Sequence, residues 1–215
     1  MSKPHAIICE GKDAKLFIQW YLVYLKGNNP KYGNFESLDG RGIDQLEDYV
    51  FNYVRTPEFR KTVKSVTLLR DYEYDEHKNP EQAIKGAFTR SGLSVPEKPF
   101  SVAYSENISA VRTAYGLFPI QSLNSNGGTL EDFCLQILID SNKDRMEITE
   151  QAISAANMQL GRFEKPYKNK FHAYLSLTDK FVGCKLGEAA NFGAFDFESP
   201  ALLPLRQLLD ELLCE

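Results

Sequence analysis

Three short apolar runs, each followed by a segment with helical periodicity, constrain the fold of this chain more than any other feature. Residues 4–10, 34–39 and 65–70 are the apolar runs, and the first is too apolar to alternate, as is typical of a central parallel strand. Segments 13–26 and 43–55 carry apolar side chains at helical spacing. This order predicts an α/β fold with a compact parallel sheet, flanked by helices and connected by right-handed crossovers.

The later part of the chain changes from mixed to helical character. Asn79 and Pro80 are typical of a helix start, and the helix they begin is expected to end near Gly92. One or two further strands are expected near 100–104 and 112–120. Helices are then predicted around Phe133–Ile139 and near 145–160, 167–182 and 200–213. We therefore predict one domain over residues 1–215, with a core of about 4–140 and a helical C-terminal extension of about 141–215.

Composition narrows the function classes without selecting one. Among the 215 residues, 43% are apolar, and the formal net charge is −4, with a pI near 5.5. These values argue against a non-specific nucleic-acid coat, which would be basic, but they permit a nuclease whose carboxylates bind divalent cations. The four cysteines and three histidines are scattered, which argues against a zinc site. Without an apolar run of about 18 residues or a signal sequence, we expect a cytoplasmic protein with no membrane partner.

An acidic residue stands at the end of the first apolar run. Glu10 is followed by Gly11 and by Asp13 in the first turn of the predicted helix. Ligands of open α/β sheets bind where strands end and helices begin, so Glu10 is a candidate functional residue. The alternative is that Glu10 and Asp13 only stabilise the N-terminus of the helix, by about 0.3–1 kcal/mol.

A second group of carboxylates follows the third run. Alternation in an extended segment places Asp71, Glu73 and Asp75 on the same side. If their strand lies beside the first, Glu10 should face Asp71 across about 5 Å. Carboxylates this close repel one another, and a divalent cation such as Mg²⁺ or Mn²⁺ relieves the repulsion. The alternative is a solvated acidic loop.

Two further acidic residues precede the helix near residue 133. Thr129-x-x-Asp132 fits a capping box, which gives Asp132 either a capping role or a supporting role in a site. Glu131 is freer to face the edge of the sheet.

Lysines and glycines near these carboxylates allow two interpretations each. Lys12 and Lys170 are candidates to stabilise negative charge near a metal-phosphate site, although most such lysines are simply solvated. Gly40 and Gly42 are explained equally well by a phosphate-binding turn and by a tight strand-to-helix backbone.

The order of these motifs resembles a known domain. Glu10-Gly11-Lys12-Asp13 after the first strand and Asp71-x-Glu73 after the third resemble the Toprim domain of topoisomerases, bacterial primases, RecR-type recombination proteins and OLD-family nucleases. The motif 128–132 and Phe195-Asp196-Phe197 are similar to small stand-alone Toprim-like proteins close to the OLD nuclease domain. The resemblance covers roughly the whole chain. The sequence departs from the Toprim signature at one position, where Glu73 replaces the usual Asp and is one methylene longer. Asp75 follows two positions later and is an alternative ligand.

The resemblance implies a function and a set of site residues. It implies a Mg²⁺- or Mn²⁺-dependent phosphodiesterase or nuclease that acts on nucleic acid, DNA or RNA. The implied catalytic residues are Glu10, Asp71, Glu73 and Lys170. The implied metal ligands are Glu10, Asp13, Asp71, Glu73, Asp75 and Glu131, supported by Lys12, Asp132, Gly40 and Gly42.

Two other functions remain open at this point. The first is a catalytically silent Toprim scaffold that binds nucleic acid or a protein partner. The second is a metal-dependent enzyme that acts on a small phosphorylated molecule. The sequence leaves open a homodimer and a separate protein partner.

Overall fold

A five-stranded sheet forms the centre of the molecule. The computed structural model describes residues 3–40, 45–72, 79–104, 111–120 and 128–214. The sheet has the strand order β2-β1-β3-β5-β4. Four strands are parallel to one another, namely β1 (His5–Cys9), β2 (Phe35–Asp39), β3 (Ser65–Asp71) and β5 (Arg112–Phe118). The short edge strand β4 (Val102–Tyr104) runs antiparallel to β5. The predicted α/β class with a mostly parallel sheet is confirmed.

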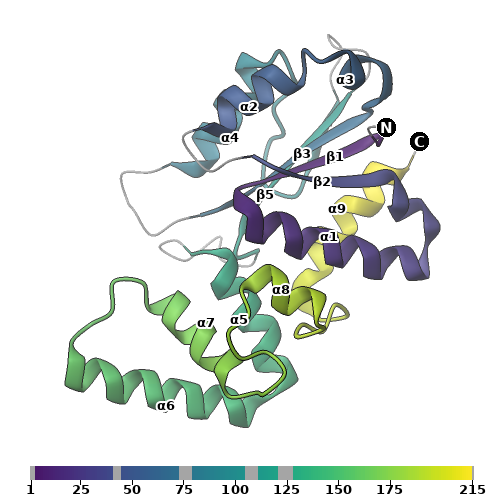
Figure 1. The fold of residues 1–215 in the computed structure, drawn as a ribbon. Helices are drawn as coiled ribbons and strands as arrows, with labels where there is room; N and C mark the ends of the chain where they lie inside the picture. The colour runs from purple at the N-terminus through teal and green to yellow at the C-terminus, as the bar shows by residue number, and fades with distance from the viewer. Residues whose placement is uncertain (1–2, 41–44, 73–78, 105–110, 121–127, 215) are drawn as a thin grey trace.

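Helices cover both faces of this sheet. Alternate residues of β1 enter different cores, because successive side chains of a strand point to opposite faces. Ala6 and Ile8 pack into the core beneath α2 (Leu46–Tyr53), α3 (Pro57–Thr62) and α4 (Pro80–Arg90). Figure 1 shows these three helices on one side of the strands.

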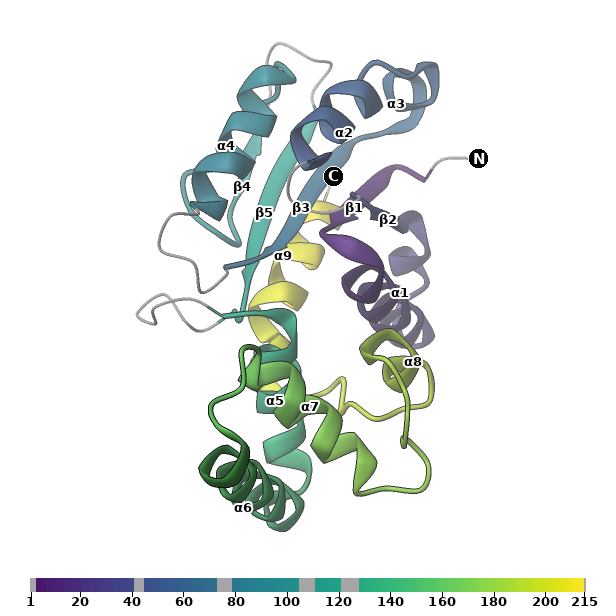
Figure 2. The same cartoon turned by 60° about the vertical axis from the view of Figure 1, so that its left-hand side comes forward.

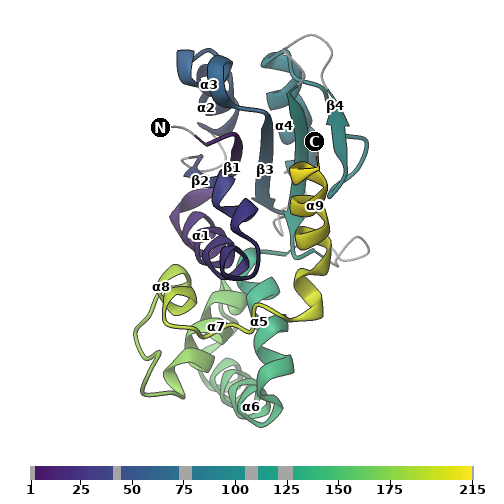
Figure 3. The same ribbon diagram turned by 90° about the vertical axis from the view of Figure 1, so that its right-hand side faces the viewer.

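The second face of the sheet carries the larger core. Ile7 and Cys9 of β1 pack there with residues of α1 (Gly11–Asn28), α5 (Leu130–Ser141) and α9 (Leu203–Leu213). Cys9 and Cys134 are both buried in this core. Figure 3 shows α9 along the sheet, although it is the last helix of the chain. The end of the C-terminal part therefore contributes directly to the main core.

The remaining helices extend this layer away from the sheet. α6 (Lys143–Leu160) and α7 (Pro166–Ser176) pack against each other and against α5. They project beyond the sheet, as Figure 2 shows. α8 (Leu186–Asn191) packs against α1.

Several short elements were not predicted from periodicity. They are α3, α8 and the 3-10 helix η1 (Pro30–Asn34), whereas the helix expected from residue 200 begins as the 3-10 helix η3 (Pro200–Leu202) and continues as α9. Each of the unpredicted elements is six residues or fewer, which is too short for a helical repeat of apolar residues to be recognised. The helix expected over 167–182 is also shorter, and ends at Ser176. Within the described ranges, no helix is both long enough and apolar enough to cross a bilayer.

Candidate functional site

A cavity of about 500 Å³ lies where β1 and β3 end. Four of the predicted acidic residues line it, namely Glu10, Asp13, Asp71 and Glu131. Three lysines share the same walls, namely Lys12, Lys165 and Lys168. The remaining lining residues are Gly11, Ala14, Thr129, Leu130, Tyr167 and Leu186. The fold thus brings together carboxylates that are as much as 121 positions apart in the sequence.

The start of α5 is fixed to the end of β3. The backbone N–H of Leu130 donates a hydrogen bond of 2.9 Å to Oδ1 of Asp71. Thr129 donates to Oδ2 of Asp132 from both its backbone N–H and its hydroxyl, each at 2.9 Å. The capping interpretation of Asp132 is therefore confirmed. These contacts hold the first turn of α5, and with it Glu131, at the cavity.

Glu10 faces Arg70 rather than Asp71. The strands β1 and β3 are neighbours, as expected, but the register pairs Cys9 with Leu69. The next position along β3 is therefore Arg70, whose Nε lies 3.1 Å from Oε2 of Glu10. The expectation that Glu10 faces Asp71 directly was wrong by one residue. The side chain of Arg70 is 1% exposed and that of Glu10 is 15% exposed, so this ion pair is held in a largely water-excluded position.

Asp13 is bound by the start of α8. Its Oδ1 accepts a hydrogen bond of 3.2 Å from the backbone N–H of Gly187. A side chain at position 187 would bring Cβ to 2.6 Å from Cβ of Leu16, so only glycine permits this approach between α8 and α1. Asp13 therefore joins two helices as well as lining the cavity.

The charges around the cavity affect two other groups. Burial raises the pKa of the Cys134 thiol, and the charges of Glu131, Asp71 and Asp13 raise it further. Partial burial lowers the pKa of Lys168, but the charge and hydrogen bond of Glu131 outweigh burial, so the net pKa is raised. Nζ of Lys168 lies 3.4 Å from Oε1 of Glu131. Lys168 is therefore an ammonium ion at neutral pH.

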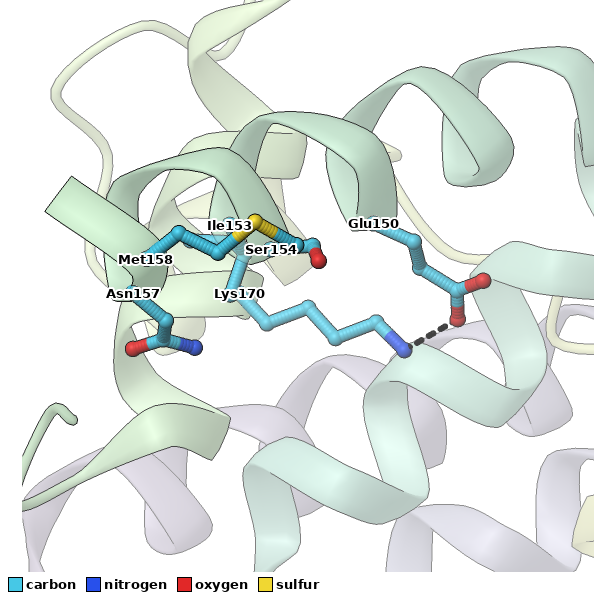
Figure 4. A pocket seen from close by; sticks show the side chains of 6 residues that line it. All are labelled: Glu150, Ile153, Ser154, Asn157, Met158 and Lys170. Atoms are coloured by element: carbon cyan, nitrogen blue, oxygen red, sulfur yellow. Dashed lines mark hydrogen bonds and ion pairs between the residues drawn. The ribbon is translucent and has the colours of Figure 1, made fainter.

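Lys170 does not line this cavity. It forms an ion pair with Glu150 of α6 and lines a different pocket, between α6 and α7, with Ile153, Ser154, Asn157 and Met158 (Figure 4). Residues two positions apart point about 200° apart around a helix, so Lys168 and Lys170 cannot face the same side of α7. Helical spacing alone does not separate the two lysines, because Lys168 lies three positions before the buried Phe171 and Lys170 lies four positions before the buried Tyr174.

Of the predicted glycines and the remaining acidic residues, the structure describes only Gly40. Gly40 donates its N–H to the carbonyl of Cys9 at 2.8 Å. A Cβ there would lie 3.0 Å from side-chain atoms of Ile8 and Leu46, so tight packing explains this glycine. Gly42, Glu73 and Asp75 lie outside the described residues.

Residues 4–214 match the model of one protein family, described as "Protein of unknown function (DUF3226)". The chain belongs to this family. Neither a curated protein nor a solved structure matches it.

The cavity of this DUF3226 member offers oxygen donors of the kind that Mg²⁺ and Mn²⁺ prefer. Within the described parts of the chain, no three His, Cys, Asp or Glu side chains are close enough to form a metal-binding group. Mg²⁺ typically needs only one or two protein carboxylates, with water and substrate phosphate completing its shell. Two carboxylates of this cavity would therefore be enough protein ligands for such an ion.

Proposed function

We propose that this protein is a Toprim-like, Mg²⁺- or Mn²⁺-dependent phosphodiesterase that acts on nucleic acid. One observation carries the proposal: a single cavity at the ends of two parallel strands combines four carboxylates with three lysines. Carboxylates attract a divalent cation, and lysines attract the phosphate that the cation also binds. The order of the acidic motifs along the chain supports the same function.

Each residue has a proposed role in this reaction. Glu10 and Asp71 would hold the ion, with Asp13 and Glu131 beside them. A bound ion of this kind lowers the pKa of its water and stabilises charge on the phosphate. Arg70 orients the Glu10 carboxylate, since its guanidinium lies 3.1 Å from one carboxylate oxygen. Lys168 takes the role predicted for Lys170, because Lys168 lines the cavity.

A plasmid-nicking assay in Mg²⁺ and in Mn²⁺ tests the proposal. Glu10→Gln and Asp71→Asn should each lower the nicking rate by about 100-fold or more, because each removes a charged ligand. Glu150→Gln is the matched control, since Glu150 is an acidic residue that lines the other pocket. It should cleave at the wild-type rate. Equal rates in all four proteins would assign the cleavage to a contaminant and reject these site residues.

A catalytically silent scaffold is the second candidate, and a specific observation favours it. All four acidic residues of the cavity already have protein partners. In a scaffold these contacts would serve folding alone. This alternative predicts that the wild type neither nicks plasmid nor binds Mn²⁺. It should nevertheless bind a labelled oligonucleotide in a gel-shift assay, or bind a protein partner.

A further inference from the structure

The four acidic residues of the cavity are balanced by two kinds of partner. Asp13 and Asp71 accept hydrogen bonds from backbone N–H groups, at 3.2 Å and 2.9 Å. Glu10 and Glu131 instead contact cationic side chains, Arg70 at 3.1 Å and Lys168 at 3.4 Å. The two backbone donors belong to helix starts and cannot leave without moving those helices. Of these four contacts between described residues, the two with side-chain cations can change partner without moving a helix.

The two cations differ in their freedom to move. The side chain of Arg70 is 1% exposed, so releasing it from Glu10 would break a buried ion pair, which is strongly unfavourable. The side chain of Lys168 is 48% exposed and sits in the first turn of α7. An ion pair at this level of exposure contributes little to stability, and its lysine can turn into water at small cost. Lys168 is therefore the exchangeable partner.

Lys168 also lies where it can bind an anion other than Glu131. It lines the cavity together with Lys165, at the start of α7. The charge of Asp71 as well as that of Glu131 acts on its ammonium group, which places Lys168 within the field of both carboxylates. A lysine that leaves Glu131 thus remains beside the proposed metal ligands, where a substrate phosphate would be bound.

We infer that Lys168 is an exchangeable cation that couples metal binding to phosphate binding. In the metal-free protein Lys168 neutralises Glu131. When a divalent cation is bound at the carboxylates, Lys168 leaves Glu131 and binds a phosphate oxygen of the substrate. The inference rests on the proposed function, and it adds that Lys168 weakens metal binding while it strengthens phosphate binding.

Direct Mn²⁺ binding to the full chain tests the exchange, with electron paramagnetic resonance measuring the free ion. Lys168→Met should bind Mn²⁺ about twofold to fivefold more tightly than wild type, because an exposed ion pair no longer competes. Lys170→Met is the matched control, a lysine of the same helix paired with Glu150. It should leave the affinity unchanged. Equal or weaker Mn²⁺ binding by Lys168→Met would overturn the inference.

Inorganic phosphate provides the second measurement. Added to the Mn²⁺-loaded proteins, it should bind about fivefold more weakly to Lys168→Met than to Lys170→Met, because one charged donor is lost. Equal phosphate affinity in the two variants contradicts the coupling. Circular dichroism melting of both variants checks that each is folded.

Failure of the proposed function gives a different pattern. A wild type that binds no Mn²⁺, or binds it equally well after Glu10→Gln and Asp71→Asn, rejects the metal site and the exchange together. A wild type that binds Mn²⁺ through Glu10 and Asp71, with no change in Lys168→Met, rejects only the exchange.

Discussion

Arg70 on β3 forms an ion pair of 3.1 Å with Glu10, which follows β1 and lines the candidate site. A buried ion pair of this kind is seldom a net source of stability, because both charges lose their hydration. Hydrophobic residues of similar volume often serve as well. We therefore interpret the pair as a device that orients the Glu10 carboxylate.

Loss of the guanidinium should destabilise the fold strongly. Arg70→Met should lower the free energy of unfolding by about 3–5 kcal/mol, since it leaves the Glu10 carboxylate without its cation in a water-excluded position. Urea unfolding followed by tryptophan fluorescence measures this. Arg90→Met is the control, because Arg90 pairs with Glu47 and Asp48 at the surface. Its unfolding midpoint should equal that of the wild type. A change below about 1 kcal/mol in Arg70→Met would show that Glu10 is readily hydrated.

The contact between α8 and α1 should depend on Gly187. Gly187→Ala should cost about 1–3 kcal/mol, because its Cβ would lie 2.6 Å from Cβ of Leu16 and the helices must separate. Gly86→Ala is the matched control within α4, where a Cβ meets no atom within 4 Å. It should gain about 0.5–1 kcal/mol, as expected for a helix-interior glycine. Thermal unfolding of both variants measures the difference, and shifts of equal sign would contradict this account of the packing.

Two buried tyrosines, Tyr21 of α1 and Tyr32 of η1, should respond oppositely to loss of the hydroxyl. Within the part of the chain that the structure describes, Oη of Tyr21 is buried without a hydrogen-bond partner, so Tyr21→Phe should stabilise the fold by about 1 kcal/mol. The hydroxyl of Tyr32 donates to Asp210 of α9, so Tyr32→Phe should cost about 1.5–3 kcal/mol. Chemical unfolding of the two variants provides the comparison. Destabilisation in Tyr21→Phe would indicate that water satisfies this hydroxyl.

Stability should fall in alkaline solution. Burial, followed by the hydrogen bond to Asp210, raises the pKa of Tyr32 to about 12, and burial also raises the pKa values of Tyr21, Tyr53 and Tyr115. An unfolded tyrosine has a pKa of about 10. Above this pH the unfolded chain loses tyrosine protons first, so stability present below pH 10 is lost as the pH rises toward 12.

Unfolding free energies at pH 9, 10 and 11 check this dependence. Wild type should lose stability progressively over this interval, and Tyr32→Phe should lose less than wild type between pH 10 and 11. A constant free energy of unfolding from pH 9 to 11 would be inconsistent with buried, neutral tyrosines.

The sequence predicted those features that depend on neighbours along the chain. The apolar run of β1, the N-cap of α4 at Asn79 and the capping box of α5 are set by residues within four positions of one another. The parallel order followed from strand–helix alternation, because a crossover helix leaves its two strands parallel. The acidic residues that follow the strands could be identified because the end of each apolar run is visible in the sequence.

Only the tertiary structure decided which of these residues meet. The pairing of Arg70 with Glu10 depends on a one-residue register between β1 and β3, and strand periodicity alone does not specify that register. The choice of Lys168 over Lys170 depends on how α7 is rotated against α5 and α6. The sequence by itself determined the longer elements and the acidic residues that follow the strands, because propensity, capping and apolar periodicity are local. Packing determined the partners of these residues, because side chains far apart in sequence are brought into contact only when the helices close over the sheet.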